Sequence, residues 1–341
     1  MKKIVVEGMR GKSEVVTLLD TYLTKRGYKV LSKVTGLDPV ISDNGVKRLI
    51  DRKGGLLLDH ENKRCLKLSK DKDFVIFEDQ GISPYTMKLF HNLVRPDLIL
   101  IPNIRLEHQE YLGETIEEIS KSFAIHFDVP ELIITTEQKE PVLNIFRTFS
   151  KKYNKSLIEI KCKEELLPSI DNLYLVDEAL KRLTGKGLTE QEWKEHKKRL
   201  IERFSVKKNH EGVKYFISSK INDVSSSLIT YNYLSKHYPE EKLCYVAYFR
   251  SDRKDRAISF IHFFNKIGIN KNVDKIFLRG DFCDYVYTKL SKEVKQKTHV
   301  IERVKIRKVM DYCKKNDKVL VTSVNGVNGF MKKLEENLEK K

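Results

Sequence analysis

The chain has few cysteines, no long hydrophobic run and no histidine cluster, and each absence excludes a class of protein. Its 341 residues include five cysteines, which are far apart and form no C-x-x-C pair. That spacing indicates neither a zinc site nor a disulfide framework. No apolar segment approaches the roughly 18 residues that a membrane helix needs. The N-terminus passes straight into a predicted strand, which leaves no room for a signal peptide. We therefore expect a protein of the reducing cytoplasm.

Positive charge, by contrast, is abundant. Lys and Arg number 65 against 48 Asp and Glu, for a formal net charge of +17. Such an excess of positive charge favours anionic partners such as nucleotides, nucleic acids or acidic polymers. A general enrichment in lysine is the alternative explanation of the charge. The lysines are scattered along predicted helices and often stand beside glutamates, as in residues 192–198. This distribution argues against a dedicated nucleic-acid arm.

The N-terminal segment is typical of a phosphate-binding turn between a strand and a helix. Its apolar strand leads into a glycine turn, and helical spacing of apolar residues follows. The turn consists of Gly8, Met9, Arg10, Gly11, Lys12 and Ser13. Backbone N–H groups in such a turn face a phosphate chain, Lys12 would reach the β- and γ-phosphates, and Ser13 would bind Mg²⁺. The pattern is a short G-x-x-G-K-S, so a glycine turn beside a surface lysine is the alternative.

Strand-like runs and helical patterns alternate along the rest of the chain, which predicts parallel sheets covered by helices. The expected strands are 28–34, 54–58, 74–77, 98–101, 132–134, 157–160, 213–217, 243–249, 275–278 and 319–322. The expected helices include 115–123, 142–149, 172–183 and 190–204. The polar segment 205–212 predicts a hinge between a domain of residues 1–205 and one of residues 206–341.

Two polar residues follow predicted strands and are candidate metal ligands. Glu78 ends an apolar strand, where a buried carboxylate needs a partner such as a cation. An exposed strand-end glutamate is the alternative. His108 comes just after another strand, and a structural histidine is the alternative there. Ligands of parallel sheets bind beyond the carboxyl ends of the strands, so both residues, Thr35 and the glycine turn can share one rim.

Taken in order, these motifs resemble the Mur ligase superfamily, most closely its poly-γ-glutamate synthase branch (the CapB/PgsB type). The similar segments are residues 8–13 (G-T-R-G-K-S in that branch), 33–39 (K-T-T-G-T-x-P), 78–84 (E-C-M-A-[LI]-x-P), 102–108 (T-N-V-R-x-D-H), 222–223 (N-D), 249–253 (N-x-R-x-D-R) and 325–329 (N-x-x-G-x-G). The resemblance implies a P-loop-type parallel-sheet central domain followed by a smaller Rossmann-like α/β domain. It also implies that the UDP-binding N-terminal domain of muramyl ligases is lacking.

The resemblance further implies ATP and Mg²⁺ as cofactors and assigns the residues that bind them. The phosphate turn would bind the triphosphate, with Lys12, Glu78 and His108 as the catalytic set. The implied metal ligands are Ser13, Thr35, Glu78 and His108. The implied nucleotide-binding residues of the second domain, which would close over ATP, are Asn222, Asp223, Arg250, Asp252 and Arg253. A surface salt bridge to Asp252 or Asp255 is the alternative for the two arginines.

The chain departs from the family pattern near both metal candidates. Glu107 replaces an aspartate before His108, and Gln80-Gly81 replaces Met-Ala after Glu78. The carbamoylated lysine of many Mur ligases falls on Ser122, with the adjacent Lys121 as a weak candidate. These substitutions affect what the resemblance implies about the acceptor and about the second metal site.

The function implied is an ATP-dependent ligase that makes an amide bond through an acyl phosphate. It would join glutamate by a γ-linkage to a glutamyl polymer or another acidic acceptor, and addition of one residue to a small cofactor is a variant of this. Relatives work beside membrane subunits, which implies a peripheral membrane partner. The alternative is a non-catalytic nucleotide- or nucleic-acid-binding protein with a ligase-like fold.

Overall fold

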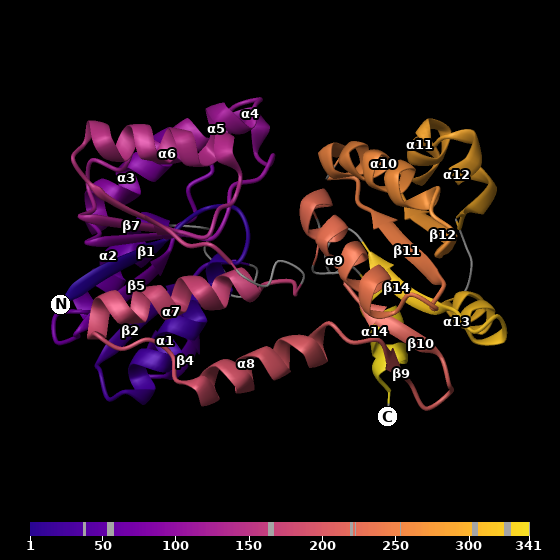
Figure 1. The fold of residues 1–341 in the computed structure, drawn as a ribbon, viewed down its shortest axis with the longest axis horizontal. Helices are drawn as coiled ribbons and strands as arrows, with labels where there is room; N and C mark the ends of the chain where they lie inside the picture. The colour runs from indigo at the N-terminus through magenta and orange to yellow at the C-terminus, as the bar shows by residue number, and fades with distance from the viewer. Residues whose placement is uncertain are drawn as a thin grey trace. The chain divides into compact units, whose positions relative to one another are not determined.

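The structure is a computed structural model that describes residues 1–36, 39–52, 58–162, 167–218, 221, 223–252, 254–301, 306–323 and 329–340, without the side chains of residues 255 and 306. The chain forms two compact units, one of residues 1–165 and 169–196 and one of residues 166–168 and 197–341. Each unit is built on a largely parallel sheet with helices packed on it (Figure 1). The α/β class predicted from the sequence is confirmed.

The first unit contains an eight-stranded sheet in the order β4-β3-β2-β5-β1-β6-β7-β8. Its strands are β1 (Lys2–Val6), β2 (Val30–Val34), β3 (Val40–Asp43), β4 (Val46–Leu49), β5 (Phe74–Glu78), β6 (Leu98–Ile101), β7 (Leu132–Thr135) and β8 (Ser156–Glu159). β1 is flanked by β5 and β6, and all three run parallel. Val6 pairs with Glu78 on one side and with Leu100 on the other, so their carboxyl ends meet around the phosphate turn.

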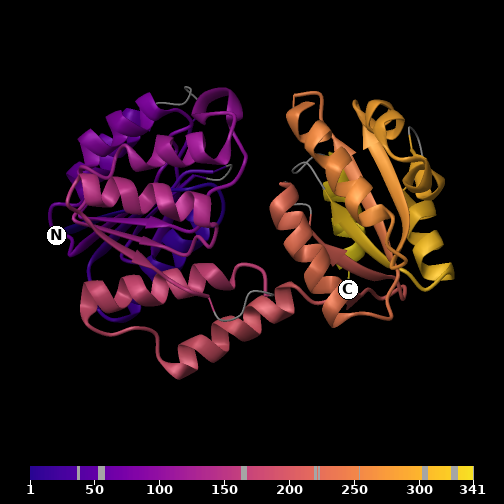
Figure 2. The same ribbon diagram turned by 45° about the horizontal axis from the view of Figure 1, so that its top comes forward.

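Helices cover both faces of this sheet, as Figure 2 shows from a second angle. They are α1 (Lys12–Lys25), α2 (Leu58–Leu68), α3 (Pro84–Val94), α4 (Gln109–Leu112), α5 (Ile116–Ala124), α6 (Glu140–Lys152) and α7 (Ile170–Thr184). The next helix, α8 (Glu190–Arg203), has residues 190–196 in the first unit and residues 197–203 in the second. One apolar cluster joins a face of the sheet to α1 and α7. Another joins the opposite face to α3, α5 and α6. The two clusters hold β1 rigidly, which fixes the start of the phosphate turn.

The antiparallel hairpin β3–β4 extends the sheet at one edge and was missed by the sequence analysis. Asn44 and Gly45 connect the strands with positive φ angles of 48° and 84°. Two positive φ values in a two-residue loop define the type I′ hairpin turn that Asn-Gly favours. That dipeptide was therefore the available signal. The predicted strand over 54–58 lies outside the described residues except for Leu58, which begins α2.

The second unit contains a six-stranded sheet in the order β13-β12-β11-β14-β10-β9. Its strands are β9 (Lys207–Lys208), β10 (Lys214–Ile217), β11 (Leu243–Phe249), β12 (Val273–Gly280), β13 (Thr298–Val300) and β14 (Val319–Ser323). Its helices are α9 (Val224–His237), α10 (Lys254–Gly268), α11 (Cys283–Lys289), α12 (Lys292–Lys297), α13 (Ile306–Lys315) and α14 (Gly329–Glu339). All strands run parallel except β9.

The segment predicted to be an irregular hinge has regular structure. Lys207 and Lys208 form β9, which pairs antiparallel with β10. Asn209 is buried, and its side-chain oxygen accepts hydrogen bonds from the backbone of Glu211 and Val213. Residues 205–212 therefore contain part of a hairpin that belongs to the second sheet. Among the described residues, no helix is long and apolar enough to cross a membrane.

Candidate active site

The phosphate turn lies between β1 and α1 and depends on its two glycines. Gly8 and Gly11 have φ angles of +103° and +88°, which L-residues rarely adopt. A Cβ on Gly8 would lie 2.7 Å from the carbonyl oxygen of Asn103, and one on Gly11 would lie 2.3 Å from Oδ1 of Asn172. Glycine thus occupies the two positions of the predicted turn, 8 and 11, at which a Cβ atom would collide with neighbouring atoms.

Asn103, which comes just after β6, holds the middle of this turn. Its carbonyl oxygen accepts a hydrogen bond from the Met9 backbone N–H at 3.0 Å. Its side-chain Oδ1 accepts one from the Arg10 N–H at 3.2 Å, and its Nδ2 donates to the Arg10 carbonyl at 3.0 Å. Because Asn103 forms hydrogen bonds with three backbone groups of the turn, the turn keeps a fixed path between the strand and the helix.

Three residues far apart in sequence converge at the carboxyl end of β5. The Ser13 hydroxyl donates to both carboxylate oxygens of Glu78, each at 3.0 Å. The backbone N–H of Thr35, just past β2, donates to Glu78 Oε2 at 2.9 Å. Glu78 is only 7% exposed, so the exposed strand-end alternative does not hold for it. The structure therefore brings together three of the four residues predicted to surround metal.

These side chains suit a magnesium ion. The Ser13 hydroxyl and the Glu78 carboxylate supply the oxygen ligands that Mg²⁺ prefers, and a nucleotide would add phosphate oxygens. Lys12, also in the turn, donates from Nζ to the carbonyl oxygen of Gly8 at 2.7 Å. Lys12 thus lies over the turn, where its ammonium can exchange that carbonyl for a phosphate oxygen.

His108, the fourth of these residues, lies in the segment after β6. His108 is exposed and precedes α4 with a φ angle of +53°. The preceding Glu107 forms an ion pair with the guanidinium of Arg10 in the phosphate turn. The Glu107 side chain, which is longer than the aspartate of the family pattern, therefore has a partner in this chain. The role of His108 as a ligand of a second metal stays a prediction, as does a carbamoylated Lys121, which is exposed on α5.

Sequence reasoning missed a second contact to the turn, which comes from the start of α7. The Asn172 side chain faces Gly11, and its Nδ2 donates to Glu14 Oε2 at 2.7 Å. Asn172 is 3% exposed. A pattern of residue types along one chain does not identify such a support, because Asn172 lies more than 150 positions away from the turn.

In the second unit, the candidate residues that the structure describes form hydrogen bonds with residues close to them in sequence. The Asp223 side chain accepts a hydrogen bond from the Ser226 N–H at 2.8 Å and caps α9. Arg250, just after β11, donates from Nε and Nη2 to the two carboxylate oxygens of Asp252 at 2.8 and 2.6 Å. This is the surface salt bridge that the sequence left open. Asn222, Arg253 and residues 325–328 lie outside the described residues, so their roles stay predictions.

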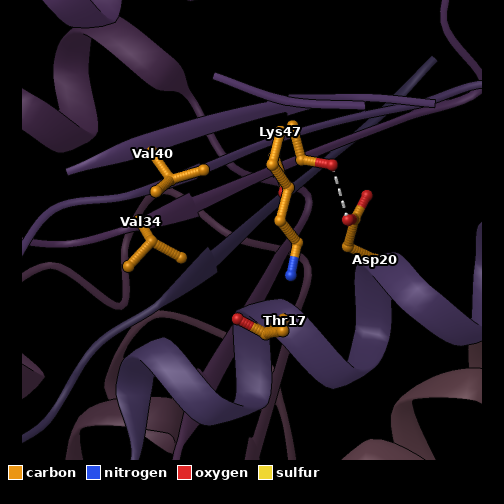
Figure 3. A pocket seen from close by; sticks show the side chains of 7 residues that line it. Thr17, Asp20, Val34, Val40 and Lys47 are labelled. Atoms are coloured by element: carbon orange, nitrogen blue, oxygen red, sulfur yellow. Dashed lines mark hydrogen bonds between the residues drawn. The ribbon is translucent and has the colours of Figure 1, made fainter. Parts of the chain in front are cut away.

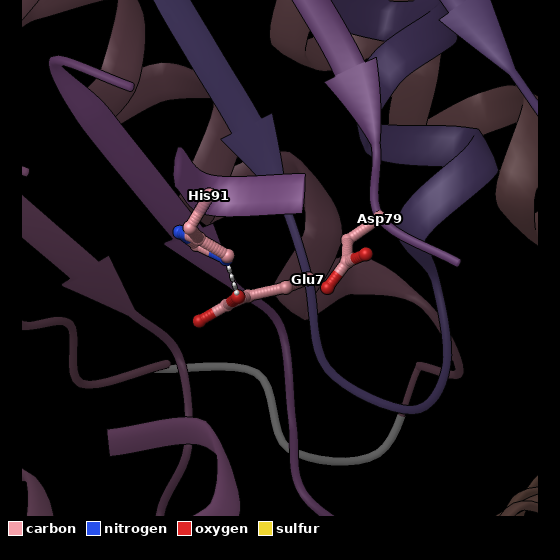
Figure 4. Close-up of side chains that lie close together, drawn as sticks. All are labelled: Glu7, Asp79 and His91. Carbon is pink, nitrogen blue, oxygen red and sulfur yellow. Dashed lines mark hydrogen bonds and ion pairs between the residues drawn. The ribbon is translucent and has the colours of Figure 1, made fainter. Parts of the chain in front are cut away.

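Another polar group that the sequence analysis missed lies directly beneath the phosphate turn. Glu7, the residue before Gly8, is fully buried, and its Oε2 lies 2.9 Å from Nε2 of the buried His91 on α3 (Figure 4). Asp79, one residue past β5, is close to both. Burial raises the pKa of the Glu7 carboxyl. The imidazole of His126 stacks on that of His91, and burial lowers the pKa of His126 to about 3.

A small pocket between α1 and the hairpin β3–β4 is separate from these groups. It is lined in part by Thr17, Asp20 and Lys47, and the Ser42 hydroxyl donates to Asp20 Oδ2 at 2.8 Å (Figure 3). Asp20 is 2% exposed, and burial raises the pKa of its carboxyl despite the hydrogen bond from Ser42. The pocket is too small to hold a nucleotide, at about 80 Å³.

Comparison with known proteins agrees with the resemblance that the motifs indicated. Residues 203–341 match the family described as "Poly-gamma-glutamate synthase CapB C-terminal domain". The chain is 22% identical over 361 aligned positions to "PGA synthase CapB" of Bacillus subtilis (strain 168), covering 98% of this chain and 90% of that protein. This relative spans both units, so the similarity is not confined to the matched C-terminal part.

Solved structures show the same fold. A folylpolyglutamate synthase of Mycobacterium tuberculosis, complexed with ADP and AMPPCP, superposes with a TM-score of 0.68 at 12% identity, over 95% of this chain and 88% of that one. A bifunctional folylpolyglutamate synthase/dihydrofolate synthase of Yersinia pestis, complexed with AMPPNP and a Mn ion, gives a TM-score of 0.65 at 15% identity, over 95% and 86%. The fold predicted from the Mur-ligase resemblance is thereby confirmed.

Proposed function

We propose that this chain is an ATP-dependent carboxylate–amine ligase that adds glutamate, by a γ-linkage, to a glutamyl polymer or another acidic acceptor. The observation that carries the proposal is the convergence of Lys12, Ser13 and Glu78 at the carboxyl ends of neighbouring strands. The similarity to a PGA synthase along nearly the whole chain supports the glutamate substrate.

The chemistry follows from the poor reactivity of a carboxylate toward amines. The acceptor carboxylate attacks the γ-phosphorus of ATP, ADP leaves, and an acyl phosphate forms. The amine of glutamate then attacks the acyl carbon, phosphate leaves with the bonding electron pair, and the amine loses a proton. Catalysis of such steps rests on positioning and charge stabilisation.

Several groups of the chain have roles in these steps. The backbone N–H groups of the glycine turn and the N-terminus of α1 bind the phosphates. Lys12 neutralises the charge that develops on the γ-phosphoryl group. Ser13 and Glu78 would hold Mg²⁺, with Thr35 orienting the Glu78 carboxylate through its N–H and His108 holding a second ion. When bound, the metal supplies charge neutralisation at the phosphates.

The acceptor class is argued from charge. A net charge of +17 suits a polyanionic glutamyl chain better than a neutral acceptor. In the second unit, Arg250 stands at the carboxyl end of β11, where ligands of parallel sheets bind, and we assign it to the nucleotide together with Asn222, Asp223, Asp252 and Arg253. We place the enzyme in the cytoplasm beside a peripheral membrane partner.

The test is product analysis by mass spectrometry after incubation with ATP, Mg²⁺, glutamate and cell extract. We expect products that grow by glutamyl residues, together with ATP turnover that glutamate stimulates. Lys12→Ala is the control that should give none. ATP turnover without any glutamylated product, combined with salt-sensitive RNA or DNA binding, would instead favour a nucleic-acid-binding protein with this fold.

A further inference from the structure

The buried group beneath the phosphate turn has the composition of a metal site. Glu7, Asp79 and His91 each offer one ligand atom, and these three atoms all lie within 4.8 Å of one another. The side chains come from the ends of β1 and β5 and from α3, and Figure 4 shows Glu7 lying between Asp79 and His91. None is more than 4% exposed.

The group combines two buried carboxylates with one imidazole, and His91 and Lys12 are the positive groups that act on Glu7. Two carboxylates lie together in the interior, where an unpaired charge is costly. His91 can neutralise one of them. His126 stacks on His91. Lys12 contributes some positive potential at Glu7, yet its ammonium donates to the Gly8 carbonyl outside the group.

A second observation concerns the hydrogen bonds of Glu7. Although the residue is fully buried, its Oε1 accepts no hydrogen bond from any residue that the structure describes. Such a buried acceptor without a donor is rare in folded proteins and calls for an explanation such as an ion. Asp79 has one fixed partner, the Gly81 N–H, which donates to its Oδ1 at 2.7 Å.

We propose that Glu7, Asp79 and His91 bind one divalent transition-metal ion, with Zn²⁺ as the representative. Two carboxylates and an imidazole form a mixed oxygen and nitrogen set, and imidazole favours Zn²⁺ or similar ions over Mg²⁺. Binding replaces the hydrogen bond between Glu7 and His91, whose shared proton leaves to the solvent. The ion cross-links β1, β5 and α3 and is distinct from the magnesium site at Ser13 and Glu78.

The experiment measures metal binding directly, without relying on enzyme activity. The full chain is stripped with EDTA and titrated with Zn²⁺, and then with Co²⁺ as a spectroscopic probe. The titration is done in a Glu78→Gln background, which removes the carboxylate of the magnesium site. We expect one equivalent of Zn²⁺, a visible Co²⁺ spectrum and a higher melting temperature. His91→Gln in the same background should weaken Zn²⁺ binding by about 100-fold.

The matched control is His126→Gln, which removes the stacked neighbouring imidazole and leaves the three ligands. It should bind Zn²⁺ more tightly than His91→Gln does, because its ring only stacks on that of His91 and all three ligands remain. Asp79→Asn, at the edge of the group, serves if His91→Gln does not fold by near-ultraviolet circular dichroism. X-ray absorption of the parent should show one imidazole nitrogen among oxygen ligands.

Two results would overturn the proposal. One is a parent chain that takes up no Zn²⁺ at about 10 µM, an affinity well below that of structural zinc sites. The other is Zn²⁺ binding that persists unchanged in both His91→Gln and Asp79→Asn. In either case the group is a buried Glu7–His91 hydrogen bond with Asp79 beside it, and its role is confined to the packing beneath the turn.

Discussion

In both sheets the candidate residues lie beyond the carboxyl ends of parallel strands. The two units differ in the partners to which these side chains form hydrogen bonds. In the first unit, Ser13 and Thr35 reach across strands to the same carboxylate of Glu78. In the second unit, Asp223 caps the helix that follows it, and Arg250 pairs with a residue two positions away. The first arrangement joins residues that are far apart in sequence, whereas the second is made within a few positions of the chain.

The largest expected effect comes from Lys12→Ala. Its ammonium lies over the phosphate turn, where it can meet a phosphate oxygen, so its loss should lower ATP turnover by about 10³-fold. The folded state should be preserved, because Lys12 lies on a turn at the start of α1. Steady-state kinetics and circular dichroism check this, with Lys25→Ala at the exposed end of the same helix as the control. Turnover near that of the wild type would refute the role of the turn.

Glu78→Gln tests whether the preorganised carboxylate holds metal. The amide keeps the shape and can still accept from Ser13 and Thr35, but it loses the charge. We expect turnover to fall at least about 100-fold at fixed Mg²⁺, with partial recovery at high Mg²⁺. Kinetics over a range of Mg²⁺ concentrations measure this. Glu110→Gln, an exposed residue of α4, is the control, and an equal response of both variants would contradict the assignment.

Gly11→Ala separates backbone strain from crowding in the turn. The φ angle of +88° is unfavourable for alanine, and the new Cβ would meet Oδ1 of Asn172. We expect a loss of about 1–3 kcal/mol in the free energy of unfolding and weaker ATP binding. Urea denaturation and nucleotide titration measure the two effects.

Gly185→Ala is the matched control for this substitution. Gly185 has a φ angle of +78°, but nothing lies within 4 Å of its would-be Cβ, so only the strain remains. Adding Asn172→Ala to Gly11→Ala should restore the part of the loss that is due to crowding. If Gly11→Ala and Gly185→Ala have equal effects, Asn172 does not constrain the turn.

Arg250→Ala tests whether the second unit takes part in the reaction. Loss of a charged hydrogen bond to the nucleotide should slow turnover by about tenfold and weaken ATP binding less. Arg307→Ala removes a comparable exposed ion pair, with Glu211, and should leave turnover unchanged. Stopped-flow kinetics and nucleotide titration distinguish the two effects. Normal kinetics for Arg250→Ala would leave this arginine as a surface salt bridge only.

The smallest expected effect concerns a buried carboxylate away from the site. Asp20→Asn can keep the hydrogen bond from Ser42 without burying a charge, so it should stabilise the chain by about 1 kcal/mol at pH 7. The folded state raises the pKa of Asp20 above 3.8, and the unfolded chain therefore ionises first as the pH rises. The gain should vanish below about pH 4. Urea denaturation at several pH values checks it, and destabilisation by Asp20→Asn at pH 7 would show that the charge contributes.

Features made by contiguous residues could be predicted from the sequence, whereas contacts between distant elements could not. Strands such as β6 and β11 have the predicted bounds, because a continuous apolar run between polar residues specifies a buried strand. The phosphate turn was predictable since its residues are contiguous. The supports from Asn103, Asn172 and His91 depend on which distant elements pack together, and no local pattern contains that information.

The central position of β1 has a consequence for the time course of folding. β1 comprises Lys2–Val6, yet its two neighbours in the sheet, Phe74–Glu78 and Leu98–Ile101, come much later in the sequence. Synthesis proceeds at about 5–20 residues per second, so the strand waits several seconds before both partners exist. During that interval its apolar side chains and its backbone hydrogen-bonding groups lack their sheet partners. The surroundings of the phosphate turn are therefore complete only after β5 and β6 have been made.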